Sequence, residues 1–320
     1  MPTLRGIRAS ILPCGRALVA LSLALLLLPI DASKAWRWPW QKEESKPATQ
    51  KHHTDKPVDS KLAASKPATP KAAAVKCEPA KFHLVVDVGH TKESDGAMSA
   101  RNVPEFEFNL KLARRVVEKL KADGFAETRL LVTEGKARPS LIRRVAAANN
   151  SHADLFLSIH HDSVPDKMLE DWEFEGRKSH FSDRFRGHSL FVSKDNANFS
   201  ASMHFAQLIG EQLKAKGLSY ATQYTLPIMG KYRHELLDKD FGIYRYDHLV
   251  VLMRTSMPAV LLEAGSIINR DEEVQMASSE RQNLIIDSVA AALKQYCGGA
   301  RAAETASSPA TNGDPAVHPP

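Results

Sequence analysis

Four residues of this chain have side chains that could bind a metal ion or move a proton, and each stands where an expected strand or helix meets a loop. They are His90, Glu105, His160 and Glu263. Three of them follow apolar runs, and Glu105 opens a helical pattern. Two histidines and one carboxylate that leave a fourth position open are a standard ligand set for catalytic zinc. A further glutamate nearby can act as a general base toward water.

Each candidate also has an ordinary structural explanation. A histidine after a strand is more often a hydrogen-bonded loop residue than a ligand, and Glu105 could simply favour the helix dipole. Glu263 could be a solvated loop carboxylate, although it follows an entirely apolar run. His161 is a poorer candidate than its neighbour, because adjacent strand residues point to opposite sides. The coincidence of four candidates at one edge of a sheet favours a zinc hydrolase.

The elements that would position these residues alternate between strand and helix from Lys81 to Tyr296. We expect strands at Phe82–Val88, Arg129–Thr133, Leu155–Ile159, His188–Val192, Leu249–Met253 and Ala259–Leu262. We expect helices from about Pro104 until Gly124 ends the first, then at Ser140–Asn149, Phe199–Lys216 and Ser279–Tyr296. This alternation predicts an α/β fold: a single domain with a twisted, mostly parallel sheet of about six strands and helices on both faces. Such sheets bind ligands at the carboxyl ends of their strands.

Two segments fit the alternation poorly, Ser163–Arg186 and Ala221–Asp240. Both are polar, charged and aromatic, which is typical of surface insertions near a site. The first carries four acidic residues: Glu170, Asp171, Glu173 and Glu175. One hypothesis is that this acidic insertion gates the site, and the alternative is a surface or substrate-contact loop.

The first 35 residues have the pattern of a secretory signal peptide. Arginines precede an uncharged, leucine-rich run from Ala17 to Ile30, and Ser33-Lys34-Ala35 offers a cleavage site. The run is shorter than the ~20 residues that a spanning helix needs, with an uncleaved anchor as the alternative. We therefore expect an exported protein without stable membrane insertion after cleavage. The signal peptide alone does not distinguish the periplasm, which is our expectation, from the outer medium.

Low-complexity segments flank the expected catalytic domain at residues 80–297. In residues 36–79 a lysine recurs every five residues from Lys46 to Lys76, a period that fits neither helix nor strand. We expect a disordered linker there and a disordered tail at 298–320. The linker is either a spacer or a weak attractor of a polyanionic wall.

The composition, with 43% hydrophobic and 25% charged residues, indicates a mostly globular chain. Its net charge of +6 leaves nucleic acid, anionic lipid and an anionic wall open as partners. Cys77 and Cys297 lie just outside the first strand and at the end of the last helix. In an oxidising compartment we expect them to be bridged rather than free. Cys14 should leave with the signal peptide.

Five short motifs follow one another in a fixed order. They are Gly89-His90; Glu105 with Asn109-Leu110; Leu141, Arg144, Ala148 and Asn149; Ser158-Ile159-His160; and Met257 through Glu263 with Gly265 and Asn269. In this order they resemble the zinc-dependent N-acetylmuramoyl-L-alanine amidases of bacterial cell walls, of the amidase-3 type. The resemblance covers about Phe82 to Tyr296, which is nearly the whole expected folded part.

The resemblance implies one zinc ion per chain, held by His90, Glu105 and His160, with Glu263 as the catalytic carboxylate. It implies hydrolysis of the amide between N-acetylmuramic acid and L-alanine, in wall remodelling or daughter-cell separation, with peptidoglycan and not nucleic acid as partner. Some relatives carry an inhibitory helix after the fourth strand, released by a protein activator. Here only Ser193 to Phe199 occupies that place.

The chain departs from the family pattern at Thr91-Lys92, at His161-Asp162 and after Gly265. None of these departures removes a candidate ligand, so they bear on substrate fit more than on chemistry. Two alternatives stay open: another exported zinc hydrolase of the wall, such as a peptidase or deacetylase, and a non-catalytic wall-binding regulator. The second usually loses a ligand or the catalytic carboxylate, and all four candidates are present here.

Overall fold

A computed structural model describes residues 77–298 of the chain. The expected signal peptide with Cys14, nearly all of the linker and all but the first residue of the tail lie outside the described residues. No helix within the described range is long and apolar enough to cross a membrane.

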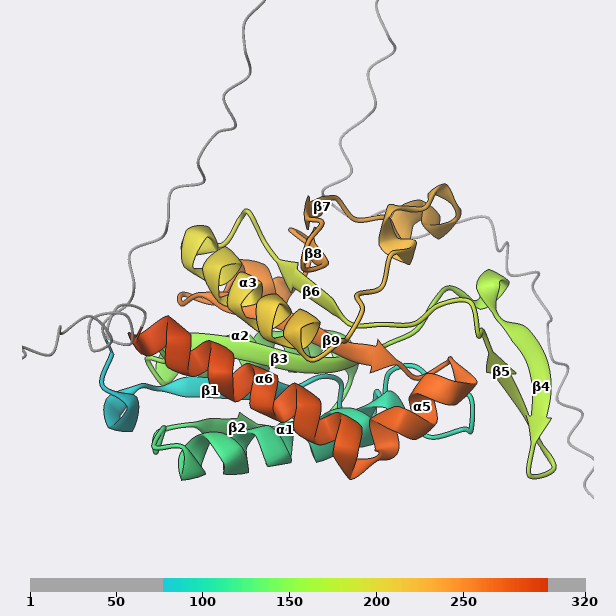
Figure 1. The fold of residues 1–320 in the computed structure, drawn as a ribbon, viewed down its shortest axis with the longest axis horizontal. Helices are drawn as coiled ribbons and strands as arrows, with labels where there is room; N and C mark the ends of the chain where they lie inside the picture. Colours follow the sequence, from blue (N-terminus) through green and yellow to red (C-terminus); the bar gives the residue numbers. More distant parts are fainter. Residues whose placement is uncertain (1–76, 299–320) are drawn as a thin grey trace, which may run out of the picture. The chain divides into compact units, whose positions relative to one another are not determined.

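The domain is built on a mixed, mostly parallel sheet (Figure 1). Its strands are β1 Leu84–Val88, β2 Arg129–Leu131, β3 Leu155–Asp162, β6 Ser189–Val192, β7 Leu236–Asp238, β8 Ile243–Arg245 and β9 Ala259–Ser266. They lie in the order β2-β1-β3-β9-β6-β8-β7. Strands β2, β1, β3 and β9 are parallel, whereas β6 runs antiparallel to β9 and β7 antiparallel to β8. The predicted fold class is confirmed.

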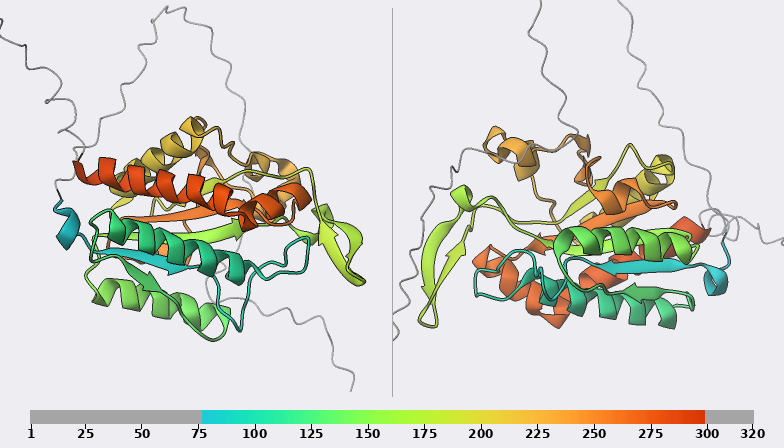
Figure 2. Two further views of the ribbon diagram at one scale, coloured as in Figure 1. Left: turned by 60° about the horizontal axis from the view of Figure 1, so that its bottom comes forward. Right: turned by 180° about the vertical axis from the view of Figure 1, so that it is seen from behind.

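Helices cover both faces of the sheet (Figure 2). They are α1 Glu105–Ala122, α2 Ala137–Asn150, α3 Phe199–Ala215, α4 Val250–Met253, α5 Arg270–Ala277 and α6 Ser279–Gly298. Alternate residues of β3 enter two separate cores: Leu157 and Ile159 pack with α1, α3 and α6, and Phe156 packs with α2 and α4. A strand buried on both faces needs the continuous apolar run that the sequence shows. No helix intervenes between β6 and the start of α3 in the described chain.

The prediction of a strand at Leu249–Met253 is wrong, because Val250–Met253 forms the single helical turn α4. A short apolar run does not distinguish a buried strand from a buried helical turn. The position beside β6 is taken instead by the three residues of Ile243–Arg245. Asn196 holds the turn in place by donating a hydrogen bond from Nδ2 to the carbonyl of Leu252 at 2.8 Å.

Both irregular segments form structure of their own at the surface. Ser163–Arg186 contains the short helix η2 Asp166–Met168 and a hairpin of β4 Glu170–Phe174 and β5 Arg177–Phe181. Trp172 anchors the hairpin by donating from Nε1 to the carbonyl of Ala100 at 2.8 Å. The four acidic residues of this insertion are all exposed, and their role as a gate stays a hypothesis.

The second segment, Ala221–Asp240, contains the short 3-10 helices η3 Gln223–Thr225 and η4 Pro227–Tyr232, followed by β7. A further short helix, η1 Pro79–Lys81, precedes β1. Strands β6, β8 and β7 extend the sheet beyond β9. Residues of this segment line the same cavity as Leu261 and Glu263 of β9, so the segment contributes to the site.

A disulfide joins Cys77 to Cys297, as predicted, and so ties the start of the domain to the last turn of α6. The two residues are 220 positions apart in the sequence. Cross-linking so long a loop restricts the unfolded chain far more than it restricts the folded one.

We expect reduction of this disulfide to lower the free energy of unfolding by up to about 5 kcal/mol. The expected fall in melting temperature is on the order of 10 °C for a domain of this size. Thermal unfolding with and without a reductant measures it, and the Cys77→Ser/Cys297→Ser variant is the control that should not respond to reductant. Equal melting temperatures of the native protein in both conditions would contradict the expectation.

Candidate metal centre and active site

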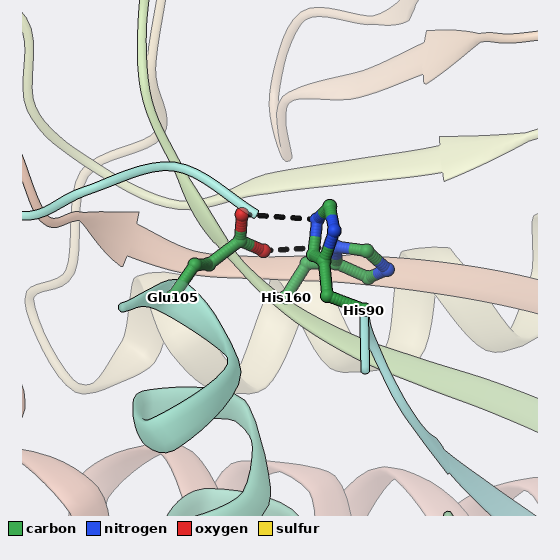
Figure 3. A group of neighbouring side chains, drawn as sticks. All are labelled: His90, Glu105 and His160. Atoms are coloured by element: carbon green, nitrogen blue, oxygen red, sulfur yellow. Dashed lines mark hydrogen bonds and ion pairs between the residues drawn. The ribbon is translucent and has the colours of Figure 1, made fainter. Parts of the chain in front are cut away.

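His90, Glu105 and His160 converge at the carboxyl ends of β1 and β3 (Figure 3). His90 follows β1, His160 lies in β3, and Glu105 is the first residue of α1. Glu105 Oε2 is 3.0 Å from His90 Nε2, and Glu105 Oε1 is 3.0 Å from His160 Nδ1. One ligand atom from each residue lies within 4.8 Å of the other two. The structure thus brings together the three residues that the sequence singled out as ligands.

Two glycines make room for this convergence. A Cβ atom on Gly89 would lie 2.5 Å from the imidazole ring of His160. A Cβ atom on Gly96 would lie 2.5 Å from Glu105 Oε2, and this residue also has a positive φ of 84°. Any larger residue at either position would displace a candidate ligand, because its Cβ atom would overlap the side chain of His160 or of Glu105.

The backbone of His90 is held in the left-handed region, with φ of 65°, by a buried arginine. Arg144 donates from Nη2 to the carbonyl of His90 and from Nε to Thr133 Oγ1 at 2.9 Å. Its Nη1 lies 3.5 Å from Asp87 Oδ2, which also accepts a hydrogen bond from Ser158 Oγ at 2.7 Å. Burial raises the pKa of Asp87 to about 6, although Arg144 opposes the shift.

A second hydrogen-bond network, centred on Asn109, orients Glu105. Asn109 donates from Nδ2 to Glu105 Oε1 at 3.0 Å and to the carbonyl of Gly89 at 3.2 Å. Its Oδ1 is 2.8 Å from His161 Nδ1. Because Asn109 uses its amide group as donor twice, its Oδ1 accepts the proton of His161 Nδ1.

His161 therefore points away from the other two histidines, as the strand geometry predicts. Burial lowers its pKa to about 3, so the ring is neutral. For Glu105, burial alone would raise the pKa, but the hydrogen bonds and charges of His160 and His90 outweigh burial and hold the pKa well below its usual range. Burial also lowers the pKa of His160, which leaves an imidazole nitrogen free to bind a metal.

Glu263 lies beside this cluster on the neighbouring strand. In the parallel register of β3 and β9 it is paired with His160, so both side chains project from the same face of the sheet. Its Oε2 is buried and has no hydrogen-bond partner among residues 77–298. Burial, reinforced by the carboxylates of Asp162 and Glu105, raises the pKa of Glu263 well above its usual range.

Asp162, two residues beyond His160, links the sheet to the second insertion. Its Oδ1 accepts a hydrogen bond from Tyr224 Oη at 2.6 Å, and its Oδ2 accepts one from Gln223 Nε2 at 3.1 Å. Burial raises the pKa of Asp162 to about 7. The insertion is thereby fixed against the edge of the sheet that carries the candidate ligands.

Comparison with known proteins identifies the family of this chain. Residues 84–295 match the model of the amidase-3 family, N-acetylmuramoyl-L-alanine amidase. The chain belongs to this family. It is 24% identical over 217 residues to a putative N-acetylmuramoyl-L-alanine amidase of Buchnera aphidicola, an alignment that covers 67% of this chain and 95% of that protein.

Two further relatives extend the comparison. The amidase AmiC of Escherichia coli is 23% identical over 238 residues, which cover 67% of this chain and 52% of AmiC. The crystal structure of the amidase Ami1 from Mycobacterium smegmatis superposes with a TM-score of 0.53 at 21% identity and covers 70% of this chain and 100% of that one. The amidase described here shares that fold.

The three converging side chains of this amidase fit a divalent metal ion of the zinc type. Two imidazole nitrogens and one carboxylate are donors that zinc accepts in catalytic sites. Metal ligands are usually oriented by further hydrogen bonds, and here Arg144 donates to the carbonyl of His90 and Asn109 donates to the carboxylate of Glu105.

Sequence reasoning missed the residues contributed by the second insertion, above all Tyr224. The segment is polar and aromatic in sequence, but its contact with Asp162 joins residues 62 positions apart and has no local pattern. The only sequence signal at Asp162 is its departure from the family motif.

We expect the Asn109→Ala variant to bind zinc about 10- to 100-fold more weakly, which is the usual effect of removing a hydrogen bond that orients a metal ligand. The physical reason is that Glu105 loses the donor that fixes its carboxylate. Competition with a chromophoric chelator measures the affinity, with exposed Asn150→Ala on α2 as the matched control. Unchanged affinity in a folded Asn109→Ala variant would show that Glu105 needs no such support.

Proposed function

We propose that this amidase hydrolyses the amide bond between N-acetylmuramic acid and L-alanine in peptidoglycan, with one zinc ion held by His90, Glu105 and His160 and with Glu263 as the catalytic carboxylate. The observation that carries the proposal is the position of Glu263. It stands on the same face as His160, one strand away, with a buried and unpartnered carboxylate oxygen.

When bound, zinc would lower the pKa of a water molecule and polarise the carbonyl of the scissile amide. The chain's own contribution is proton transfer by Glu263. A carboxylate whose surroundings raise its pKa above the usual range is a stronger base than an ordinary one, and it can accept a proton from water and return it to a departing amine. In this substrate the departing amine is that of L-alanine.

The remaining polar groups act on the position of the ligands. Arg144 fixes the backbone of His90 and Asn109 fixes the carboxylate of Glu105. Neither residue is among those that line the cavity next to Glu263. They are positioning residues, since their effect on the reaction passes through the side chains that they orient.

The expected signal peptide supports a place of action outside the cytoplasmic membrane, and we propose the periplasm, where the substrate is found. The Lys- and Pro-rich linker at 36–79 then serves as a tether or spacer. A protein activator stays an expectation from the family resemblance.

We expect the mature protein with zinc to release intact stem peptides with a free N-terminal alanine from purified sacculi. The Glu263→Gln variant should lose activity by about 10²- to 10⁴-fold, which is the usual contribution of a general acid–base group. Mass spectrometry of the released peptides measures both, with exposed Glu107→Gln as the matched control.

A chelator arm completes this experiment. Activity should disappear on removal of the metal and return on addition of zinc. Equal release in excess chelator would refute the zinc assignment, and a fully active Glu263→Gln variant would refute the role of Glu263. Free amino sugars or cleaved stem peptides as products would point to a deacetylase or a peptidase instead.

A further inference from the structure

A cavity of about 580 Å³ opens beside Glu263 and has a wall of aromatic side chains. We refer to it as the aromatic pocket, because its lining includes the rings of Phe191, Tyr224, Tyr232, His234 and Tyr246, with Met229 beside them. Building on the proposed function, we propose that the aromatic pocket binds a sugar ring of the glycan strand, so that the enzyme recognises the sugar side of the scissile bond and not only the peptide side.

The aromatic pocket begins at the reacting centre. Ala97 lines one part of it, and the amide of Ala97 donates a hydrogen bond to Glu105 Oε2 at 3.2 Å. Glu263 forms another part of the wall, and Tyr232 in η4 belongs to the second insertion. A molecule in this cavity would therefore have one end beside the candidate ligands. The volume lies within the range of small-molecule sites, about 300–1,000 Å³.

Tyr232 is the accessible ring of the wall, at 47% exposed, whereas Phe191 and Tyr224 are 3% and 7% exposed and pack against their aromatic neighbours. The ring centroid of Phe191 is 5.1 Å from that of Tyr224, 5.2 Å from that of His234 and 5.8 Å from that of Tyr246. A pyranose ring presents C–H bonds on its faces and hydroxyl groups at its edge, so that a face packs on aromatic carbon while the edge keeps its polar contacts. Tyrosine rings suit this mixed surface, since each has an apolar body and a polar tip.

The charges of the aromatic pocket favour a sugar over a stem peptide. Its charged side chains are Glu263 and Asp166, and none of its lining residues, all within 77–298, is lysine or arginine. Burial lowers the pKa of His234, which keeps that ring neutral. A stem peptide brings carboxylates, and these would be desolvated here without a positive partner. An N-acetylated sugar brings no charge on its ring.

The positive charge of this region lies elsewhere. A second cavity, of about 420 Å³, is lined by Arg184, Arg186 and Arg281 together with Glu272, which pairs with Arg281 at 3.1 Å. Lys231, which is next to Tyr232 in sequence, holds its ammonium group 5.1 Å from the centre of that ring and does not line the aromatic pocket. These cations are therefore not among the residues that would contact a molecule in the aromatic pocket.

Tyr232 offers the cleanest test because its side chain is accessible. It is 47% exposed, and Ile228 in the same 3-10 helix is 43% exposed but does not line the aromatic pocket. The test compares kcat/KM for two substrates with the same stem peptide. One carries the GlcNAc–MurNAc disaccharide, and the other carries only the D-lactyl group in amide linkage to L-alanine.

We expect the zinc-loaded wild type to prefer the sugar-bearing substrate. In Tyr232→Ala the ratio of the two kcat/KM values should fall by about tenfold, mainly through KM, which corresponds to the loss of one aromatic contact. Tyr232→Phe keeps the ring and should keep most of the preference, and Ile228→Ala should keep all of it. An equal loss on both substrates, or a wild type without preference, would overturn the inference.

A binding measurement separates this inference from the proposed function. Saturation-transfer NMR with the peptide-free disaccharide should show binding to the wild type and about tenfold weaker binding to Tyr232→Ala, whether or not the protein cleaves anything. A wild type that cleaves neither substrate would refute the proposed function alone if the disaccharide still binds in this way. Cleavage of both substrates without binding of the disaccharide would refute the sugar pocket alone, and binding of the free stem peptide weakened by Tyr232→Ala would identify the peptide as its occupant.

Discussion

The buried carboxylate of Glu105 is the constraint on which the site depends. A carboxylate removed from water is costly unless charged or hydrogen-bonding groups surround it. Here His90, His160, Asn109 and the amide of Ala97 do so. These partners come from the ends of β1 and β3, from α1 itself and from the loop between β1 and α1. The start of α1 is thereby tied to two strand ends, and the same contacts that satisfy the buried charge gather three donors for a metal.

The parallel arrangement of β1, β3 and β9 carries this constraint to the neighbouring strand. Because parallel strands end at the same edge, the register that pairs His160 with Glu263 sets the proposed catalytic carboxylate beside the candidate ligands. On the other side of β9 lies β6, which runs antiparallel to it. The chain that follows α3 packs against this edge of the sheet, where Tyr224 donates a hydrogen bond to Asp162. The sheet thus brings Glu263 and the candidate ligands together, and the second insertion contributes residues to the neighbouring cavity.

Much of this could be predicted from the sequence because it rests on local patterns. The apolar runs before His90, His160 and Glu263 are long enough to specify strands, and the spacing of apolar residues after Glu105 specifies a helix. The strand predicted at Leu249–Met253 is wrong because a run of five apolar residues fits a buried helical turn equally well. The aromatic pocket could not be predicted from the sequence for a different reason. Its wall combines residues from β6, η3, η4 and the chain around β8, and no spacing in the sequence records that they meet.

The proposed site requires that His90, Glu105 and His160 together hold one zinc ion. Anomalous diffraction at the zinc absorption edge, from crystals of the zinc-loaded protein, is the decisive test. We expect one strong peak per chain, with an imidazole nitrogen of each histidine at about 2.0–2.1 Å and a Glu105 oxygen at about 2.0–2.2 Å. A structure without a peak at this cluster, or with zinc bound by other residues, would contradict it.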